Sequence, residues 1–198
     1  MLGLGGLGLV SLVARPAGAA AAPEAFVRDL AGELLATLRD RSLSTAERLR
    51  RMDRLVDRSF AFERIAKIAL GRYWKVASER ERAEFSALFK AAVLASYSRR
   101  FNEYAAHELR VAAAAPAGEQ ASVESYLEGG RAPVRLDWRL APTDGGWRVL
   151  DVTVEGVSLL VTYRNEFATV IEQGGGRVSA LIGELRNRAG STSPSASG

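Results

Sequence analysis

The sequence contains no cysteine among its 198 residues and only one histidine, His107. The missing thiols exclude disulfide scaffolds, cysteine nucleophiles and cysteine-ligated zinc or iron-sulfur sites. A single histidine leaves most histidine-based metal sites and catalytic triads without their parts. Many enzyme classes are therefore excluded before any motif is considered, and no cofactor is expected.

The sequence also lacks a marked excess of residues of one charge sign. The chain carries 27 Lys and Arg against 23 Asp and Glu, and the two signs are interspersed, most clearly over residues 48–58. Such mixing is typical of a solvated helix face, whereas a nucleic-acid-binding protein presents a one-sided basic patch. We therefore expect no nucleic-acid partner. A hydrophobic content of 47% is enough for one good-sized core, so a single globular domain is expected.

The apolar run at residues 1–13 falls short of the roughly 20 residues that a membrane span needs. Small residues follow it at 17–22, and the combination is the pattern of a cleaved secretory signal. We expect residues 1–22 to be a signal peptide and the protein to be periplasmic; an uncleaved anchor or a disordered tail are the alternatives. Residues 190–198 are expected to form a disordered tail, which leaves 23–189 as the domain.

Hydrophobic residues recur at three- and four-residue spacing in six stretches of the chain. They predict helices over residues 23–38, 44–56, 60–70, 78–101, 158–171 and 178–185. Ser44 with Glu47 and Ser78 with Glu81 have the spacing of capping boxes, which place the starts of two of these helices. Glycines at 71 and at 174–176 are expected to end two others.

After His107 the hydrophobic period changes to two. Val134, Leu136, Trp138 and Leu140 alternate with charged residues, which predicts a strand with one covered and one exposed face. Residues 108–113, 123–128 and 147–155 add three more strands, joined by hairpin turns. Helices, then strands, then helices indicate an α+β fold, with helices packed on one face of a twisted antiparallel sheet of about four strands.

Four short blocks carry a family resemblance. They are residues 69–74 (ALGRYW), 147–152 (WRVLDV), 155–159 (EGVSL) and 163–167 (YRNEF). Together, in this order and at this spacing, they resemble the MlaC family, also called the toluene-tolerance family. Its members share a Leu-Gly-x-Tyr-Trp block, a long helix with Phe and Tyr, and an Asp-Val-x-x-Glu-Gly-Val-Ser segment before Tyr-Arg-x-x-Phe. The resemblance extends over nearly all of the chain after residue 22.

The resemblance implies a periplasmic carrier that is not an enzyme and that moves phospholipid between the outer and inner membranes, maintaining lipid asymmetry. Its implied partners are an outer-membrane MlaA-porin complex and an inner-membrane ABC transporter with an MCE-domain subunit. The implied fold encloses the acyl chains in an apolar pocket and leaves the headgroup near solvent. A hopanoid-associated branch of the family makes a hopanoid-type lipid the alternative cargo.

Inward-facing apolar positions on the predicted helices and sheet are expected to line this pocket, and ordinary core packing is the alternative for each of them. The lipid-binding residues expected are Phe62, Ile65, Leu70, Trp74, Phe89, Val93, Tyr97, Leu136, Trp138, Val152, Val154, Leu160, Tyr163 and Phe167. A carrier needs a pocket about as apolar as the membrane, because a strong polar anchor would trap the lipid.

Two other functions stay open at this point. Asp151 and Glu155 are expected on the same strand face as Trp147, where they, or His107, could act as a base on an apolar substrate. Pairing with arginines is the simpler role for both carboxylates, and Ser158 is expected to cap a helix. A protein-binding adaptor with a filled core is the third possibility.

Overall fold

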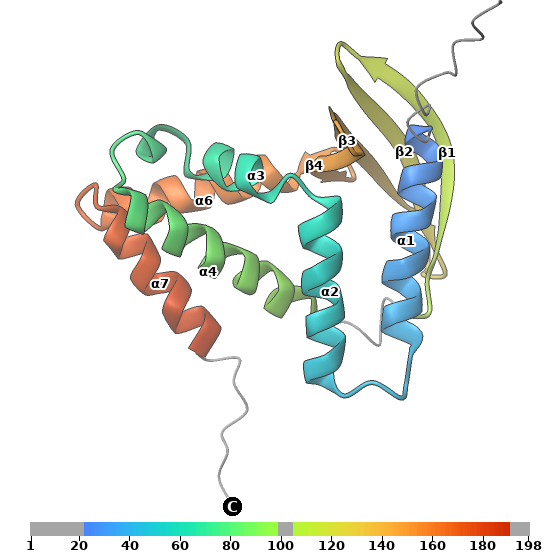
Figure 1. Ribbon diagram of the computed structural model, residues 1–198, viewed down its shortest axis with the longest axis horizontal. Helices are drawn as coiled ribbons and strands as arrows, with labels where there is room; N and C mark the ends of the chain where they lie inside the picture. The colour runs from blue at the N-terminus through green and yellow to red at the C-terminus, as the bar shows by residue number, and fades with distance from the viewer. Residues whose placement is uncertain (1–21, 99–104, 191–198) are drawn as a thin grey trace, which may run out of the picture.

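The protein is described here by a computed structural model that covers residues 22–98 and 105–190 (Figure 1). The expected signal peptide and tail fall almost entirely on residues 1–21 and 191–198, outside the described part. In chain order the elements are α1 (Pro23–Arg39), α2 (Thr45–Ser59), α3 (Phe62–Leu70), the 3-10 helix η1 (Gly71–Trp74), α4 (Glu79–Ser98), β1 (Glu108–Ala117), β2 (Gln120–Glu128), β3 (Val134–Thr143), β4 (Gly146–Val154), β5 (Val157–Ser158), α6 (Leu159–Gln173) and α7 (Val178–Gly190). The α+β class is confirmed.

The helix starts follow the predicted caps. Ser44 and Glu47 form a complete capping box, in which the Ser44 side chain accepts from the Glu47 N–H and the Glu47 carboxylate accepts from the Ser44 N–H. Ser78 and Glu81 exchange the same two hydrogen bonds before α4. Each box satisfies backbone N–H groups that have no partner inside the helix, so these two boundaries are determined by adjacent residues.

The sheet has five antiparallel strands in the order β1-β2-β3-β4-β5, one more than predicted. The extra strand is only two residues long, too short to show a hydrophobic period. It is formed by a tight turn at Glu155 (φ 48°) and Gly156 (φ 81°). Positive φ at both central residues matches the right-handed twist of the flanking strands, so the chain reverses here and pairs Val154 with Val157.

A β-bulge in β4 corrects the predicted strand faces. The pairing between β3 and β4 runs from Leu140 with Val149 directly to Arg139 with Asp151, which leaves Leu150 as an extra residue. An extra residue reverses the alternation of side chains beyond it. Asp151 therefore lies on the sheet face opposite to Trp147, and the prediction that they share a face was wrong.

One hydrophobic cluster lies between α1, α2 and the sheet. Val27 and Leu30 of α1 and Leu55 of α2 pack against the inner face of β2, β3 and β4. Its buried members are Val27, Leu30, Leu55, Ala121, Val123, Trp138, Leu140 and Val149. We call this group the sheet cluster. Figure 1 shows α1 running along the sheet with α2 beside it.

A second hydrophobic cluster joins α3, α4, α6 and α7, which lie together beyond the β4 side of the sheet (Figure 1). We call it the helical cluster. Phe85, Phe89 and Phe167 form its centre, with ring centroids 5.0–5.6 Å apart and at most 2% of each residue exposed. Aromatic rings at these separations attract one another beyond the burial of their area. The helices after α2 thus have a core of their own.

The end of α2 connects the two clusters. Phe60 packs against both, and the N–H of Ala61 donates to the carbonyl of Val149 at 2.9 Å. Arg148 of β4 donates to the carbonyl of Asp57 at 2.7 Å, which satisfies a backbone acceptor in the last turn of α2. The α2–α3 junction is therefore held directly against the central part of β4.

Candidate functional site

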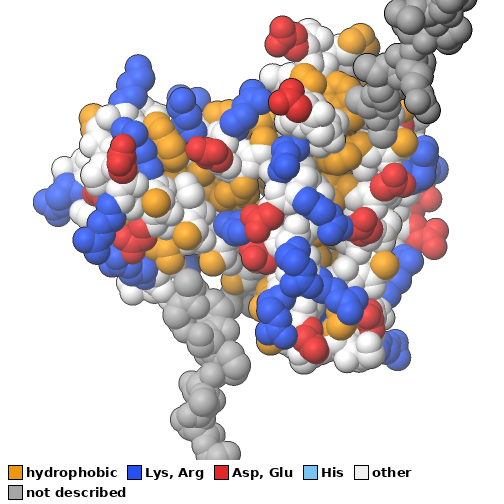
Figure 2. Space-filling view, viewed as in Figure 1, with side chains coloured by type: hydrophobic (Ala, Val, Ile, Leu, Met, Phe, Trp, Pro, Cys, Tyr) orange, Lys and Arg blue, Asp and Glu red, His pale blue; other side chains and the backbone are white. Residues whose placement is uncertain are grey.

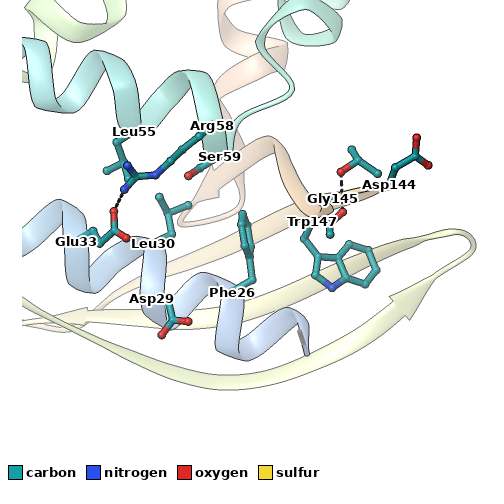
Figure 3. A pocket seen from close by; sticks show the side chains of 12 residues that line it. Phe26, Asp29, Leu30, Glu33, Leu55, Arg58, Ser59, Asp144, Gly145 and Trp147 are labelled. Atoms are coloured by element: carbon teal, nitrogen blue, oxygen red, sulfur yellow. Dashed lines mark hydrogen bonds and ion pairs between the residues drawn. The ribbon is translucent and has the colours of Figure 1, made fainter. Parts of the chain in front are cut away.

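A cavity of about 540 Å³ lies between α1, the end of α2 and the β3–β4 turn (Figure 3). The residues that line it are Phe26, Asp29, Leu30, Glu33, Leu55, Arg58, Ser59, Thr143, Asp144, Gly145, Gly146 and Trp147. This volume is in the range of small-molecule sites, which are concave and have a few polar groups around an apolar floor. We call it the apolar cavity.

The floor of the apolar cavity is continuous with the sheet cluster. Leu30 and Leu55 are 5% and 3% exposed and belong to that cluster, and half-buried Phe26 and Trp147 pack against it. In the space-filling view, hydrophobic side chains reach the surface between the upper ends of α1 and α2 and the strands (Figure 2). An apolar molecule entering here would meet the inner face of the sheet.

The polar groups beneath this floor are satisfied. Trp138 donates from its indole Nε1 to the hydroxyl of fully buried Ser125 at 2.8 Å. The Ser125 hydroxyl donates in turn to the carbonyl of Leu136 at 3.3 Å. The two buried donors of this wall, the Trp138 indole and the Ser125 hydroxyl, therefore both have acceptors within the sheet.

The rim of the apolar cavity is charged. Asp29, Glu33, Arg58 and Asp144 surround the opening, and Arg58 forms an ion pair with Glu33 across the gap between α2 and α1 (Figure 3). A second cavity of about 380 Å³ continues along the same gap. We call it the charged cavity; it is lined by Glu33, Ala36, Thr37, Asp40, Arg51, Arg54, Leu55 and Arg58.

The fourteen residues expected to line a lipid pocket fall into separate groups. Nine belong to the helical cluster or pack against it: Phe62, Ile65, Leu70, Trp74, Phe89, Val93, Leu160, Tyr163 and Phe167. Leu136, Trp138 and Val152 belong to the sheet cluster or pack against it, and Val154 pairs with Leu136. The side chain of Tyr97 lies outside the described residues. None of the other thirteen lines the apolar cavity.

The helical cluster is densely packed around Tyr163. Its ring lies 5.0 Å from that of Phe89 and 5.7 Å from that of Phe167. Burial raises the pKa of the Tyr163 hydroxyl above its ordinary value, since removal from water disfavours the phenolate. This part of the molecule is a packed aromatic core.

The residues that could have acted as bases are engaged in structure. Asp151 accepts from the Ser158 hydroxyl at 2.5 Å and from the Leu160 N–H at 3.0 Å. Ser158 in turn accepts from the Val161 N–H at 3.0 Å, so the prediction that it caps a helix is confirmed. Glu155 accepts from the backbone N–H of Arg135 at the β4–β5 turn.

His107 also lies away from the apolar cavity. It precedes β1, and its backbone carbonyl accepts from Arg39 at 2.7 Å. Over residues 22–98 and 105–190, no group of three or more acidic or histidine side chains is arranged to hold a metal ion. In the same ranges, no helix is both long and apolar enough to cross a membrane.

The residues that form the apolar cavity were not recognised from the sequence. Phe26 and Leu30 belong to the hydrophobic repeat that predicts the helix over residues 23–38, and Leu55 to the repeat of the helix over 44–56. Helical spacing identifies a buried face but does not distinguish a packed neighbour from an empty space. The aromatic Trp147, placed directly after a predicted turn, was the one local signal of an exposed apolar site.

Comparisons with known proteins agree with this architecture. The family model described as MlaC protein matches residues 28–187, which include all of the described strands and nearly all of the helices. A phospholipid-binding protein from Ralstonia solanacearum, solved in complex with a phospholipid, superposes with a TM-score of 0.75 and 27% sequence identity. The match covers 85% of this chain and 97% of that one. This chain therefore belongs to the MlaC family.

Proposed function

We propose that this protein is a lipid carrier that holds phospholipid acyl chains in the apolar cavity and against the sheet cluster behind it. The observation that supports the proposal most directly is the Ralstonia solanacearum protein, which matches over 97% of its length and was solved with a phospholipid. The apolar cavity gives this chain a place for such a ligand, with Leu30 and Leu55 as its floor.

The chemistry of the cavity suits reversible binding. Removing a methylene group from water contributes about 0.8 kcal/mol, so an acyl chain prefers this floor to solvent. Relative to a bilayer the same burial is close to neutral, because lipid tails surround the chain there as well. The charged groups of the rim, Glu33 and Arg58, are both 57% exposed and therefore interact only weakly. Uptake of a lipid from a membrane and its release to a membrane therefore both cost little free energy.

Membership of the MlaC family supports a periplasmic location and a route for lipid between the outer and inner membranes. The carrier works in the periplasm after removal of residues 1–22, with 23–189 as the lipid-binding domain. It receives phospholipid from an outer-membrane MlaA-porin complex and delivers it to an inner-membrane ABC transporter with an MCE-domain subunit, or carries it in reverse. The exchange maintains the lipid asymmetry of the outer membrane, and no catalytic step is part of it.

Purification without detergent, followed by solvent extraction and mass spectrometry, tests the proposal. We expect phospholipid at a stoichiometric ratio to protein. A hopanoid-type lipid in its place would overturn the phospholipid assignment, and a protein that carries no lipid and takes up none from vesicles would contradict the carrier function itself.

The position of the acyl chains is tested by two matched substitutions. Leu55→Trp fills the apolar cavity, whereas Leu160→Trp adds the same bulk to the helical cluster. We expect Leu55→Trp to lower phospholipid occupancy while Leu160→Trp leaves it near the wild-type level in the folded fraction. Loss of lipid only in Leu160→Trp would place the chains among the helical residues expected from the sequence. Circular dichroism of both variants controls for folding.

A further inference from the structure

The two cavities meet along the gap between α1 and α2. Glu33, Leu55 and Arg58 line both of them. On one side of these three residues the lining is the apolar floor with Phe26 and Leu30. On the other side it consists mainly of charged residues, and Figure 2 shows Lys and Arg side chains gathered over α2. An apolar compartment that opens into a charged one suits a molecule with tails and a polar headgroup.

In the charged cavity, the arginine side chains and the carboxylate side chains lie on opposite sides of the gap. Arg51, Arg54 and Arg58 lie at three- and four-residue spacing on α2, so they share one helix face. Glu33 of α1 and Asp40, the residue directly after α1, face them across the gap. Asp40 already accepts two hydrogen bonds from Ser42, which lower its pKa. It also forms an ion pair with Arg51 at 3.4 Å.

The remaining charges are incompletely matched. Glu33 pairs with Arg58, and both side chains are 57% exposed. For Arg54, the described part of the chain supplies no ion pair. An exposed ion pair contributes little to stability, so a ligand that offers both partners a replacement can open it at small cost. A ligand that replaces only one partner leaves the other charge alone.

We infer that this gap is the headgroup site of a zwitterionic, amine-bearing phospholipid. The phosphate displaces Glu33 and binds Arg58 and Arg54, because guanidinium groups match phosphate oxygens in geometry and charge. The ammonium group of the same headgroup binds the released Glu33 carboxylate. A phosphate with an uncharged alcohol leaves Glu33 without a cation, and the site therefore favours the zwitterion. This inference rests on the proposed function.

Isothermal titration of the lipid-free protein with four short-chain compounds tests the inference. They are dioctanoyl phosphatidylethanolamine, dioctanoyl phosphatidylglycerol, dioctanoylglycerol and the tail-free glycerophosphoethanolamine. We expect phosphatidylethanolamine to bind about fivefold more tightly than phosphatidylglycerol, as one or two exposed charge pairs allow. Tight binding of the tail-free compound would show a soluble phosphodiester site instead and would overturn the lipid headgroup assignment.

Three variants assign the roles of the residues. Arg58→Gln should weaken the binding of both phospholipids and leave the binding of dioctanoylglycerol unchanged. Glu33→Gln should remove the preference for phosphatidylethanolamine, because it strengthens the binding of phosphatidylglycerol. Arg50→Gln is the matched control: it removes the same charge from α2 outside both cavities and should change neither lipid.

The outcomes separate this inference from the carrier function. Equal binding of both phospholipids and dioctanoylglycerol, unaffected by Arg58→Gln, would overturn the headgroup site while leaving lipid binding intact. A preference for phosphatidylglycerol would overturn the assignment of Glu33. Failure of every tailed compound to bind the wild-type protein would contradict the proposed function instead.

Discussion

Lys90 of α4 reaches Asp57 of α2, with its Nζ atom 2.8 Å from the Oδ1 atom of that carboxylate. Asp53, one turn earlier on α2, accepts from the same ammonium group at 2.9 Å. Burial works to lower the pKa of Lys90, but the hydrogen bonds to Asp57 and Asp53 outweigh it, and the pKa lies above its ordinary value. This contact joins the helical cluster to the helix that borders the cavities.

Lys90→Gln should destabilise the protein by about 1 kcal/mol, because both carboxylates lose their shared cation. Urea unfolding at low ionic strength measures the change, and salt should reduce the difference from wild type because it screens the charges. Lys67→Gln, at an exposed position of α3, is the control and should have a much smaller effect. Equal losses in both variants would refute a specific contact between α4 and α2.

Ser158→Ala should cost about 1 kcal/mol by removing the cap of α6. The Val161 N–H loses its acceptor, and Asp151 loses a donor, since Ser158 bonds to both. Thermal unfolding followed by circular dichroism gives the loss. Thr162→Ala is the comparison, because that hydroxyl only donates to the backbone carbonyl of Ser158, which the Ser158→Ala substitution keeps, and its removal should be nearly neutral. A neutral Ser158→Ala would contradict the cap.

Gly71→Ala should be destabilising by roughly 1–3 kcal/mol, since Gly71 ends α3 at φ 58° and ψ −130°, a conformation that residues with a Cβ avoid. The added methyl group would also lie 3.2 Å from Nε of Arg164. Gly145→Ala offers a control, because a Cβ there meets open space and φ is not in the left-handed range. Chemical denaturation of the two variants should differ clearly; similar curves would rule out strain at Gly71.

Acid should weaken both capping boxes. Side-chain and backbone hydrogen bonds from Ser44 lower the pKa of Glu47, and those from Ser78 lower the pKa of Glu81, below the ordinary value of 4.5. A carboxylate with a lowered folded-state pKa stabilises the fold above its ordinary pKa, and that stabilisation is lost as pH falls through the folded value.

Unfolding free energies compared between neutral pH and about pH 3 measure this effect. The double variant Ser44→Ala/Ser78→Ala lacks the two hydroxyl donors but keeps the backbone N–H donors, so its stability should fall less steeply with acid than that of the wild type. Ser86→Ala is the control, because its hydroxyl donates only to the carbonyl of Arg82 in the same helix. Parallel pH profiles in the wild type and the double variant would contradict the role of the boxes.

Local signals in the sequence were sufficient for most element boundaries. Ser44, Ser78 and Ser158 begin helices as predicted, and the glycines after residue 173 separate α6 from α7. The alternation around Trp138 correctly identified a strand with one buried face. The family was also recognisable, because its motifs lie at fixed places along the chain. Two features near β4 were missed, the bulge at Leu150 and the short strand after Gly156.

Short-range patterns were thus enough to predict the α+β class, the helix caps and the family, since each depends on residues within a few positions of one another or on ordered motifs. Where the interior is filled and where it is open follows instead from the packing of distant elements. Leu30, Leu55 and Trp147 come from three elements, and the space between them depends on how those elements pack. The pairing of Glu33 with Arg58 is decided in the same way, because no local rule brings these two side chains together.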